Sequence, residues 1–120
     1  MQVSKRKLNG VLEKQLFSTF YQLVLDLKNK EEAETVFGDL FSQTELLSVI
    51  KRLSVAYWLS KNRSYENIKN NLNVSSATIA DVQTGIKSKG WKLMLEKLSA
   101  DEWATVWEQK IKGAFKIPHP

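Results

Sequence analysis

The chain has no cysteine, a single histidine and two prolines among its 120 residues. Without cysteine, disulfides and thiolate metal sites are excluded. His119 stands between the two prolines at the end of the sequence, where a frayed tail is expected rather than a metal ligand or a catalytic base. No apolar run is long enough for a signal peptide or a membrane span. We therefore expect one domain in the reducing cytoplasm, with no membrane partner and no bound metal.

Motifs that carry catalysis are also missing. The sequence has no glycine-rich loop that would hold a phosphate, and no pair of carboxylates at a spacing typical of acid-base catalysis. We predict no catalytic residues and do not expect an enzyme. Strand signals are absent too, because apolar and polar residues nowhere alternate between hairpin turns. The signal that remains is helical, and it predicts an all-α fold of about six helices.

A long helical pattern at residues 8–27 carries an apolar stripe that covers more than half of the helix circumference. A helix on the surface of a monomer needs only one apolar face, and so short a chain offers few elements to cover both sides. We therefore predict that a second copy of the chain covers this helix in a homodimer. The alternative is a central helix in a compact monomer. The stripe consists of Val11, Leu12, Leu16, Phe17, Phe20, Tyr21, Leu23, Val24 and Leu27.

Two helix-start signals follow this stripe. After a polar break at residues 28–30, acidic residues at 31–34 indicate the first turn of another helix, because a helix dipole favours acid there. Ser42 and Glu45 then have the spacing of a capping box, in which each side chain bonds to the backbone amide of the other residue. They predict a helix over residues 42–60.

Near the other end of the chain, the sequence predicts a hinge and two further helices. Gly85 and Gly90 bracket a short basic stretch, which indicates a break in the helical pattern. Apolar residues at helical spacing resume at Trp91. The capping-box spacing of Ser-Ala-Asp-Glu at residues 99–102 predicts that a separate last helix begins there, and Gly113 is expected to end it.

Residues 64–87 contain two short helical patterns joined by a tight turn, which is the outline of a helix-turn-helix. Ser64 is placed to cap the first helix, and a serine of the pair at 75–76 to cap the second. Asn73 tolerates the left-handed conformation that ends a helix, and Val74 can fill the corner between the helices. The predicted inner faces hold Tyr65, Ile68 and Leu72 in the first helix and Ile79, Val82 and Ile86 in the second.

The outer face of the second helix suits insertion into the major groove of DNA. Its side chains are small and polar, whereas bulky apolar residues would hold the helix away from the base edges. The net charge of +5 favours an anionic partner, and basic side chains gather around this hairpin. Hairpins of this kind also occur in all-α proteins that bind no DNA. We expect double-stranded DNA as the partner.

Two stretches, SQTELLSVIKRLSVAYWL at 42–59 and SYENIKNNLNVSSATIADV at 64–82, resemble the Trp repressor family. The first is similar to the family's central helix, which opens with a Ser or Thr followed by acidic residues and has a basic middle. The second is similar to the family's helix-turn-helix, in which an Ala-Thr-Ile tripeptide lies near the start of the second helix. The resemblance implies an intertwined all-α homodimer and one domain at 1–120. Dimerisation helices would lie at 8–60 and 91–113, and the helix-turn-helix, called the reading head below, at 64–87.

The resemblance also places the DNA contacts. Matched to the family residue by residue, they fall on the reading head. We also predict DNA contacts for Gln83, on the outer face of the second helix, and for Lys87, which follows that helix. Glu66 stands where the family often has a cation, so we expect a different operator sequence. The positions that match the family's contacts are Lys69, Ser76, Ala77, Thr78 and Ala80.

For an effector, the resemblance gives a mixed result. The family holds its tryptophan co-repressor between two arginines, of which the first falls on Lys51 or Arg52 and the second on Asp81. A carboxylate cannot stack on an indole as a guanidinium does, and it repels a ligand carboxylate. The sequence therefore identifies no certain cofactor, and L-tryptophan fits poorly because Asp81 replaces the family arginine. Another effector, held by Lys51 or Arg52, stays open.

Together these observations predict a dimeric, sequence-specific transcriptional regulator that represses by occupying a palindromic site. A replication-initiator-like DNA-binding domain shares this kind of reading head, although the ATPase portion of such a protein is missing here. A helical adaptor, in which the basic hairpin binds an acidic protein surface, is the alternative from another class. Salt-sensitive and sequence-dependent binding to duplex DNA separates the adaptor from the regulator.

Overall fold

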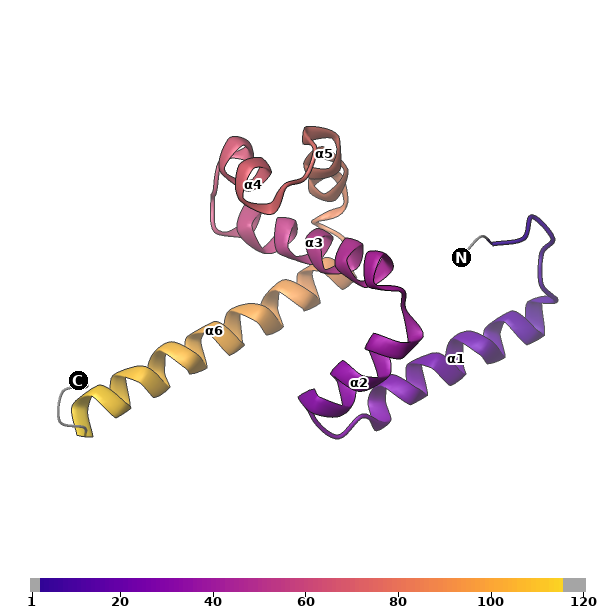
Figure 1. The fold of residues 1–120 in the computed structure, drawn as a ribbon, viewed down its shortest axis with the longest axis horizontal. Coiled ribbons are helices and arrows are strands. Elements are labelled where there is room, and N and C mark those ends of the chain that lie inside the picture. The colour runs from indigo at the N-terminus through magenta and orange to yellow at the C-terminus, as the bar shows by residue number, and fades with distance from the viewer. Residues whose placement is uncertain (1–2, 116–120) are drawn as a thin grey trace. The chain divides into compact units, whose positions relative to one another are not determined.

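A computed structural model describes the backbone of residues 3–115 and the side chains of residues 3–102. The described chain is all-α and contains no strand, which confirms the predicted fold class (Figure 1). It forms two compact units, Met1–Leu46 and Leu47–Pro120. The helices are α1 (Gly10–Asp26), α2 (Lys30–Leu40), α3 (Gln43–Ser60), α4 (Tyr65–Leu72), α5 (Ser76–Gly85) and α6 (Lys89–Phe115).

The first unit leaves most apolar side chains of α1 exposed. Asn9 caps helix α1, because its side-chain oxygen accepts hydrogen bonds from the first-turn amides. No residue of α1 or α2 is buried. Phe17 is 54% exposed and Leu16 is 50% exposed. Phe17 and Phe20 each contact the ring of Tyr21, so the aromatic side chains of α1 pack against one another along the helix surface. Within this unit, the wide stripe predicted from the sequence is therefore largely uncovered, with two of its nine members partly buried.

Helix α3 begins at the predicted capping box. The Glu45 amide donates to Ser42 Oγ at 3.1 Å, and the Ser42 amide donates to Glu45 Oε1 at 2.9 Å. Hydrogen bonds to the Glu45 carboxyl from the backbone and then the side chain of Ser42 hold its pKa below the usual value. The helix ends at Ser60, where the sequence predicted its end.

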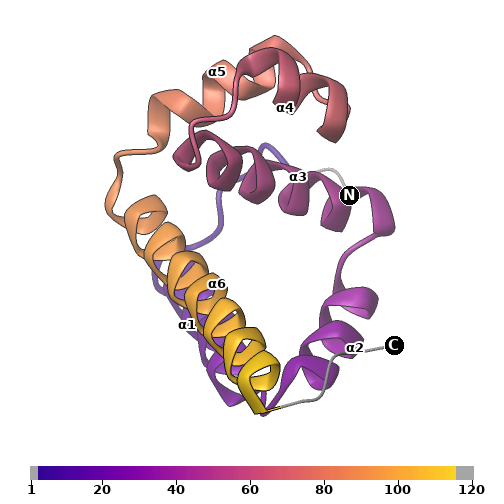
Figure 2. The same cartoon turned by 90° about the vertical axis from the view of Figure 1, so that its left-hand side faces the viewer.

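The second unit has a small core in which α4 and α5 lie against one side of α3 (Figures 1 and 2). Its five buried side chains come from these three helices, and partly buried Leu72, Val74 and Ile86 pack around them. The inner stripe predicted for the reading head is thus confirmed for most of its members, although Tyr65 is 40% exposed. The buried residues are Val55 and Ala56 from α3, Ile68 from α4, and Ile79 and Val82 from α5.

The prediction of a separate helix starting at Ser99 is wrong. Helix α6 runs without a break from Lys89 to Phe115, and it also passes through Gly113. Glu102 does not cap the Ser99 amide, because its carboxylate accepts a hydrogen bond from Tyr57 in α3 and pairs with Lys61 just after that helix. The predicted break before α6 is confirmed, because α5 ends at Gly85. The side chains predicted for the last helix, beyond Glu102, lie outside the described side chains.

Candidate nucleic-acid interface

The reading head has the helix-turn-helix geometry that its sequence predicts. Ser64 Oγ accepts a hydrogen bond from the Asn67 amide at 3.1 Å, and Ser75 Oγ accepts one from the Thr78 amide at 3.1 Å. Each serine therefore begins a helix by satisfying an amide that has no partner inside that helix. Between the helices, Asn73 takes the left-handed conformation with φ 57° and ψ 50°. This single residue ends α4 and turns the chain into α5.

The turn is attached to the central helix by a contact that sequence reasoning missed. The ammonium group of Lys51 in α3 donates a hydrogen bond to the backbone carbonyl of Asn73 at 3.3 Å. Arg52, the next residue, is exposed, and so is Asp81 on α5. No hydrogen bond or ion pair joins any two of Lys51, Arg52 and Asp81 in the described part of the chain. The role of these three residues in effector binding stays a prediction. Lys51 also has a structural role, because its hydrogen bond attaches the turn to α3.

The outer face of α5 is open and is built from small side chains. Thr78 is half-buried, and its hydroxyl lies 2.9 Å from Ser75 Oγ, so it takes part in the cap of the helix. The other predicted DNA-binding residues have no hydrogen bond from their side chains within the described structure and are free to contact a partner. Their DNA contacts remain predictions. The exposed ones are Lys69 on α4, Ser76, Ala77, Ala80 and Gln83 on α5, and Lys87 after α5.

Comparison with known proteins identifies the family. The family model described as Trp repressor protein matches residues 15–99, which is well over half of the chain. The chain belongs to the Trp repressor family. It is 31% identical over 98 residues to "Uncharacterized protein YerC" of Bacillus subtilis, with 80% of this chain and 90% of that protein covered. A TrpR-like protein from Eubacterium eligens, known from a crystal structure, is 31% identical with a TM-score of 0.69, covering 76% of this chain and 96% of its own.

Membership of the Trp repressor family makes the chain a relative of DNA-binding regulators rather than of enzymes. The resemblance seen in residues 42–87 is thereby confirmed and extended toward both ends of the chain. Within residues 3–102, no group of histidine and carboxylate side chains is arranged to hold a metal ion. No helix in the described residues is long and apolar enough to cross a membrane.

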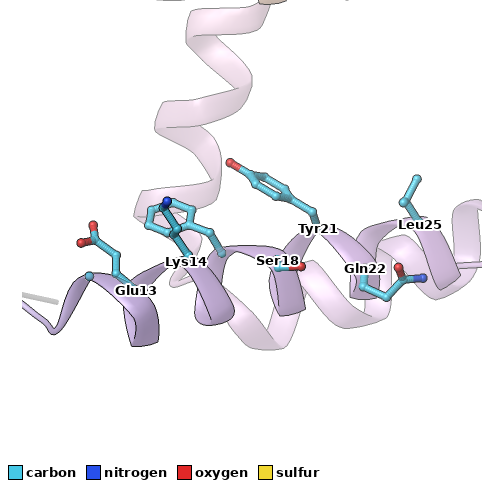
Figure 3. A pocket seen from close by; sticks show the side chains of 8 residues that line it. Glu13, Lys14, Ser18, Tyr21, Gln22 and Leu25 are labelled. Carbon is cyan, nitrogen blue, oxygen red and sulfur yellow. The ribbon is translucent and has the colours of Figure 1, made fainter.

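An open hollow along α1 is a poor candidate for a ligand site in this Trp repressor family member (Figure 3). Sites for small molecules are enclosed by several elements, which bury most of the ligand surface. Here one helix supplies every lining side chain, so the hollow is a surface between neighbouring side chains. The lining residues are Gly10, Glu13, Lys14, Phe17, Ser18, Tyr21, Gln22 and Leu25.

A polar cluster joins the end of α3 to α6. Glu102 on α6 accepts a hydrogen bond from the Tyr57 hydroxyl and forms an ion pair with the Lys61 ammonium group at 2.6 Å. The same ammonium group lies 5.4 Å from the centre of the Tyr57 ring. Sequence reasoning missed this cluster because no local pattern links residues so far apart along the chain. The positive charge of Lys61 is therefore already compensated.

The pKa values of this cluster define the pH range in which it holds. The hydrogen bonds from Lys61 and then Tyr57 keep the pKa of Glu102 below its usual value, and this carboxylate raises the pKa of both donors. Because folding lowers the pKa of Glu102, its ionised carboxylate stabilises the folded protein. This stabilisation is complete above the pKa of the group in the unfolded chain, and it is lost as pH falls through its pKa in the folded chain. Because folding raises the pKa values of Tyr57 and Lys61, their protonated forms also stabilise the folded protein. This stabilisation is complete below their pKa values in the unfolded chain, and it is lost as pH rises through their pKa values in the folded chain. The full contribution of the cluster is thus present between about pH 4.3 and about pH 10, the unfolded pKa values of glutamate and tyrosine.

We expect Glu102→Gln to lower the pKa of one tyrosine, because the carboxylate that accepts the Tyr57 proton in a hydrogen bond is gone. Alkaline titration of the phenol groups, followed by near-ultraviolet absorbance, measures this change among the three tyrosines. Glu96→Gln, an exposed substitution on the same helix, is the matched control and should leave the curve as it is. An unchanged curve for Glu102→Gln would contradict the cluster.

Proposed function

We propose that this protein is a sequence-specific transcriptional regulator that binds duplex DNA as a homodimer and represses by occupying a palindromic site. The observation that carries the proposal is the division of α5 into two faces. Ile79 and Val82 are fully buried on its inner face, while Ala77, Ala80 and Gln83 are exposed on its outer face. A helix held rigidly from behind, with small side chains in front, can approach base edges closely.

The exposed stripe of α1 supports the homodimer. Large apolar side chains stand uncovered on this helix, and none of its residues is buried. Contiguous apolar surface of this kind on a soluble protein usually marks an interaction site. A second copy offers the same stripe, and a two-fold axis would cover both at once. Two reading heads related by that axis would match a palindromic operator.

Substitutions in the reading head test the proposal. Lys69→Ala should weaken binding to every duplex, because a lysine mainly neutralises phosphate. It should also reduce the slope of log affinity against log salt by about 0.9 for each phosphate that the lysine neutralised. Ala77→Lys should change which sequence is preferred, because it adds a donor on the outer face of α5. Fluorescence anisotropy on duplexes selected from a random pool measures both effects.

Lys30→Ala, which removes the same charge from α2, is the matched control and should keep both the salt slope and the preferred sequence. Binding that ignores both reading-head substitutions would show that α5 does not read DNA. Binding to acidic proteins but to no duplex would favour the helical adaptor instead.

Free tryptophan should not raise operator affinity appreciably. Asp81 is exposed on α5, and the resemblance to the family puts this carboxylate at the position of the second arginine that holds tryptophan. Loss of a cation-π stack costs about 1 to 2 kcal/mol in a partly dry site, so tryptophan should bind about tenfold or more weakly than to a site with arginine there. Calorimetric titration of tryptophan into the unmodified protein and into Asp81→Arg measures the difference. Tight binding to the unmodified protein would refute the role given to Asp81.

A further inference from the structure

Arg63, in the connection between α3 and α4, is held in place by two contacts. Its guanidinium carbon lies 4.0 Å from the centre of the Trp58 ring, and its Nη1 donates a hydrogen bond to Asn67 Oδ1 at 3.3 Å. Trp58 is itself half-buried and packs against the core of the second unit. The guanidinium is therefore fixed on a rigid base, although the residue is exposed.

The charge of Arg63 is not compensated by the protein. Lys61 lies in the same connection, and its ammonium group is paired with Glu102 at 2.6 Å. Arg63 pairs with no carboxylate among residues 3–102. The two neighbouring cations thus differ in one respect. Lys61 forms an ion pair within the protein, whereas the charge of Arg63 can interact with solvent or with a partner.

A stacked arginine remains able to bind an anion. Stacking occupies the face of the guanidinium and leaves its N–H groups pointing outward in the plane, where only one of the five is used by Asn67. A guanidinium in this state matches the oxygens of a phosphate with two parallel hydrogen bonds. Because its position is already fixed, little side-chain entropy is lost when the phosphate binds.

The position of Arg63 in the motif identifies the phosphate. It directly precedes the cap of α4, the first helix of the reading head, and in helix-turn-helix proteins this helix crosses the DNA backbone. We propose that Arg63 binds a backbone phosphate of the DNA duplex and thereby sets the register in which α5 enters the groove. This inference rests on the proposed function and adds to it a contact outside the base-reading face.

The test compares Arg63→Gln with Lys61→Gln on a duplex selected by the unmodified protein, with affinity measured across a salt series. Arg63→Gln should reduce the salt slope by about 0.9 per protomer. The ratio of wild-type to variant affinity should accordingly shrink about 3-fold per protomer between 50 and 200 mM salt. Lys61→Gln removes the same charge from a cation that Glu102 already neutralises, so its slope should stay close to that of the wild type. Arg63→Lys keeps the charge and should keep most of the slope.

A second measurement needs no variant and therefore does not depend on how a substitution affects folding. Phenylglyoxal modifies accessible guanidinium groups, and mass spectrometry reports the rate at each arginine. Bound duplex should protect Arg63 from modification.

Each outcome separates the two claims. If the unmodified protein bound no duplex, the proposed function itself would fail. If it bound duplex while Arg63→Gln kept the full salt slope, or while Arg63 stayed as reactive as in the free protein, the phosphate contact would be refuted and the proposed function would stand. A role in packing alone would lower thermal stability and leave the salt slope unchanged.

Discussion

Replacing Phe17 with aspartate should convert the proposed dimer to a monomer at micromolar concentration. Phe17 is 54% exposed on α1 and lies in the stripe proposed to face a second copy. Burying a phenylalanine side chain is worth about 1.5 to 3 kcal/mol, and a two-fold interface contains it twice. Its loss, with a carboxylate to desolvate in its place, should raise the dimer dissociation constant by roughly 100-fold or more. Sedimentation equilibrium of the two proteins measures this.

Gln15→Asp provides a matched control on the same helix. Gln15 is exposed, and two steps of about 100° place it almost opposite Phe17 on the helix circumference. The same charge should therefore leave the dimer intact there. If the wild-type protein sedimented as a stable, well-folded monomer, the proposed dimer would be refuted. If the two substitutions had equal effects, the stripe on α1 would not be the interface.

Ile79→Ala should destabilise the reading head by about 2 to 5 kcal/mol, the usual cost of emptying so much volume from a packed core. Ile79 is fully buried where α5 meets the other helices of the second unit. Only five side chains are buried among residues 3–102, so few neighbours can move in to fill the cavity. Urea unfolding followed by circular dichroism, at one fixed protomer concentration, measures the change.

The control for this substitution is Ala80→Ser. Ala80 is the next residue along the chain, but it lies on the exposed face of α5. A small polar substitution at an exposed position usually alters stability by no more than about 0.5 kcal/mol. A loss of under about 1 kcal/mol for Ile79→Ala would mean that the core is packed more loosely than the structure indicates.

Local hydrogen bonds explain why much of the fold was predictable. The caps at Ser42, Ser64 and Ser75 each bind an amide three residues away, and a short sequence window contains both partners. The left-handed residue Asn73 is likewise a property of one side chain and its own backbone. Asn9 and Asn29 begin α1 and α2 by the same chemistry, and their capping role could have been identified from the sequence in the same way.

The failure at Ser99 has the opposite cause. The spacing of Ser99 and Glu102 is that of a capping box, but Glu102 binds Tyr57 and Lys61, which lie far away along the chain. A local pattern cannot report that competition. The bond from Lys51 to Asn73 and the stack of Arg63 on Trp58 depend in the same way on how helices pack. The DNA contacts and effector residues expected from the sequence remain predictions, because their partners are not part of the chain.

The small core also bears on how much of the protein a cell can maintain. With five buried side chains in the described part of the second unit and a largely exposed α1, a lone chain has little apolar burial to offset its conformational entropy. In the proposed dimer, association supplies the rest, so the folded fraction depends on concentration. Chains made in small numbers would be open to proteases before they found a partner. The threshold for repression would then be set by survival of the chain as well as by affinity for DNA.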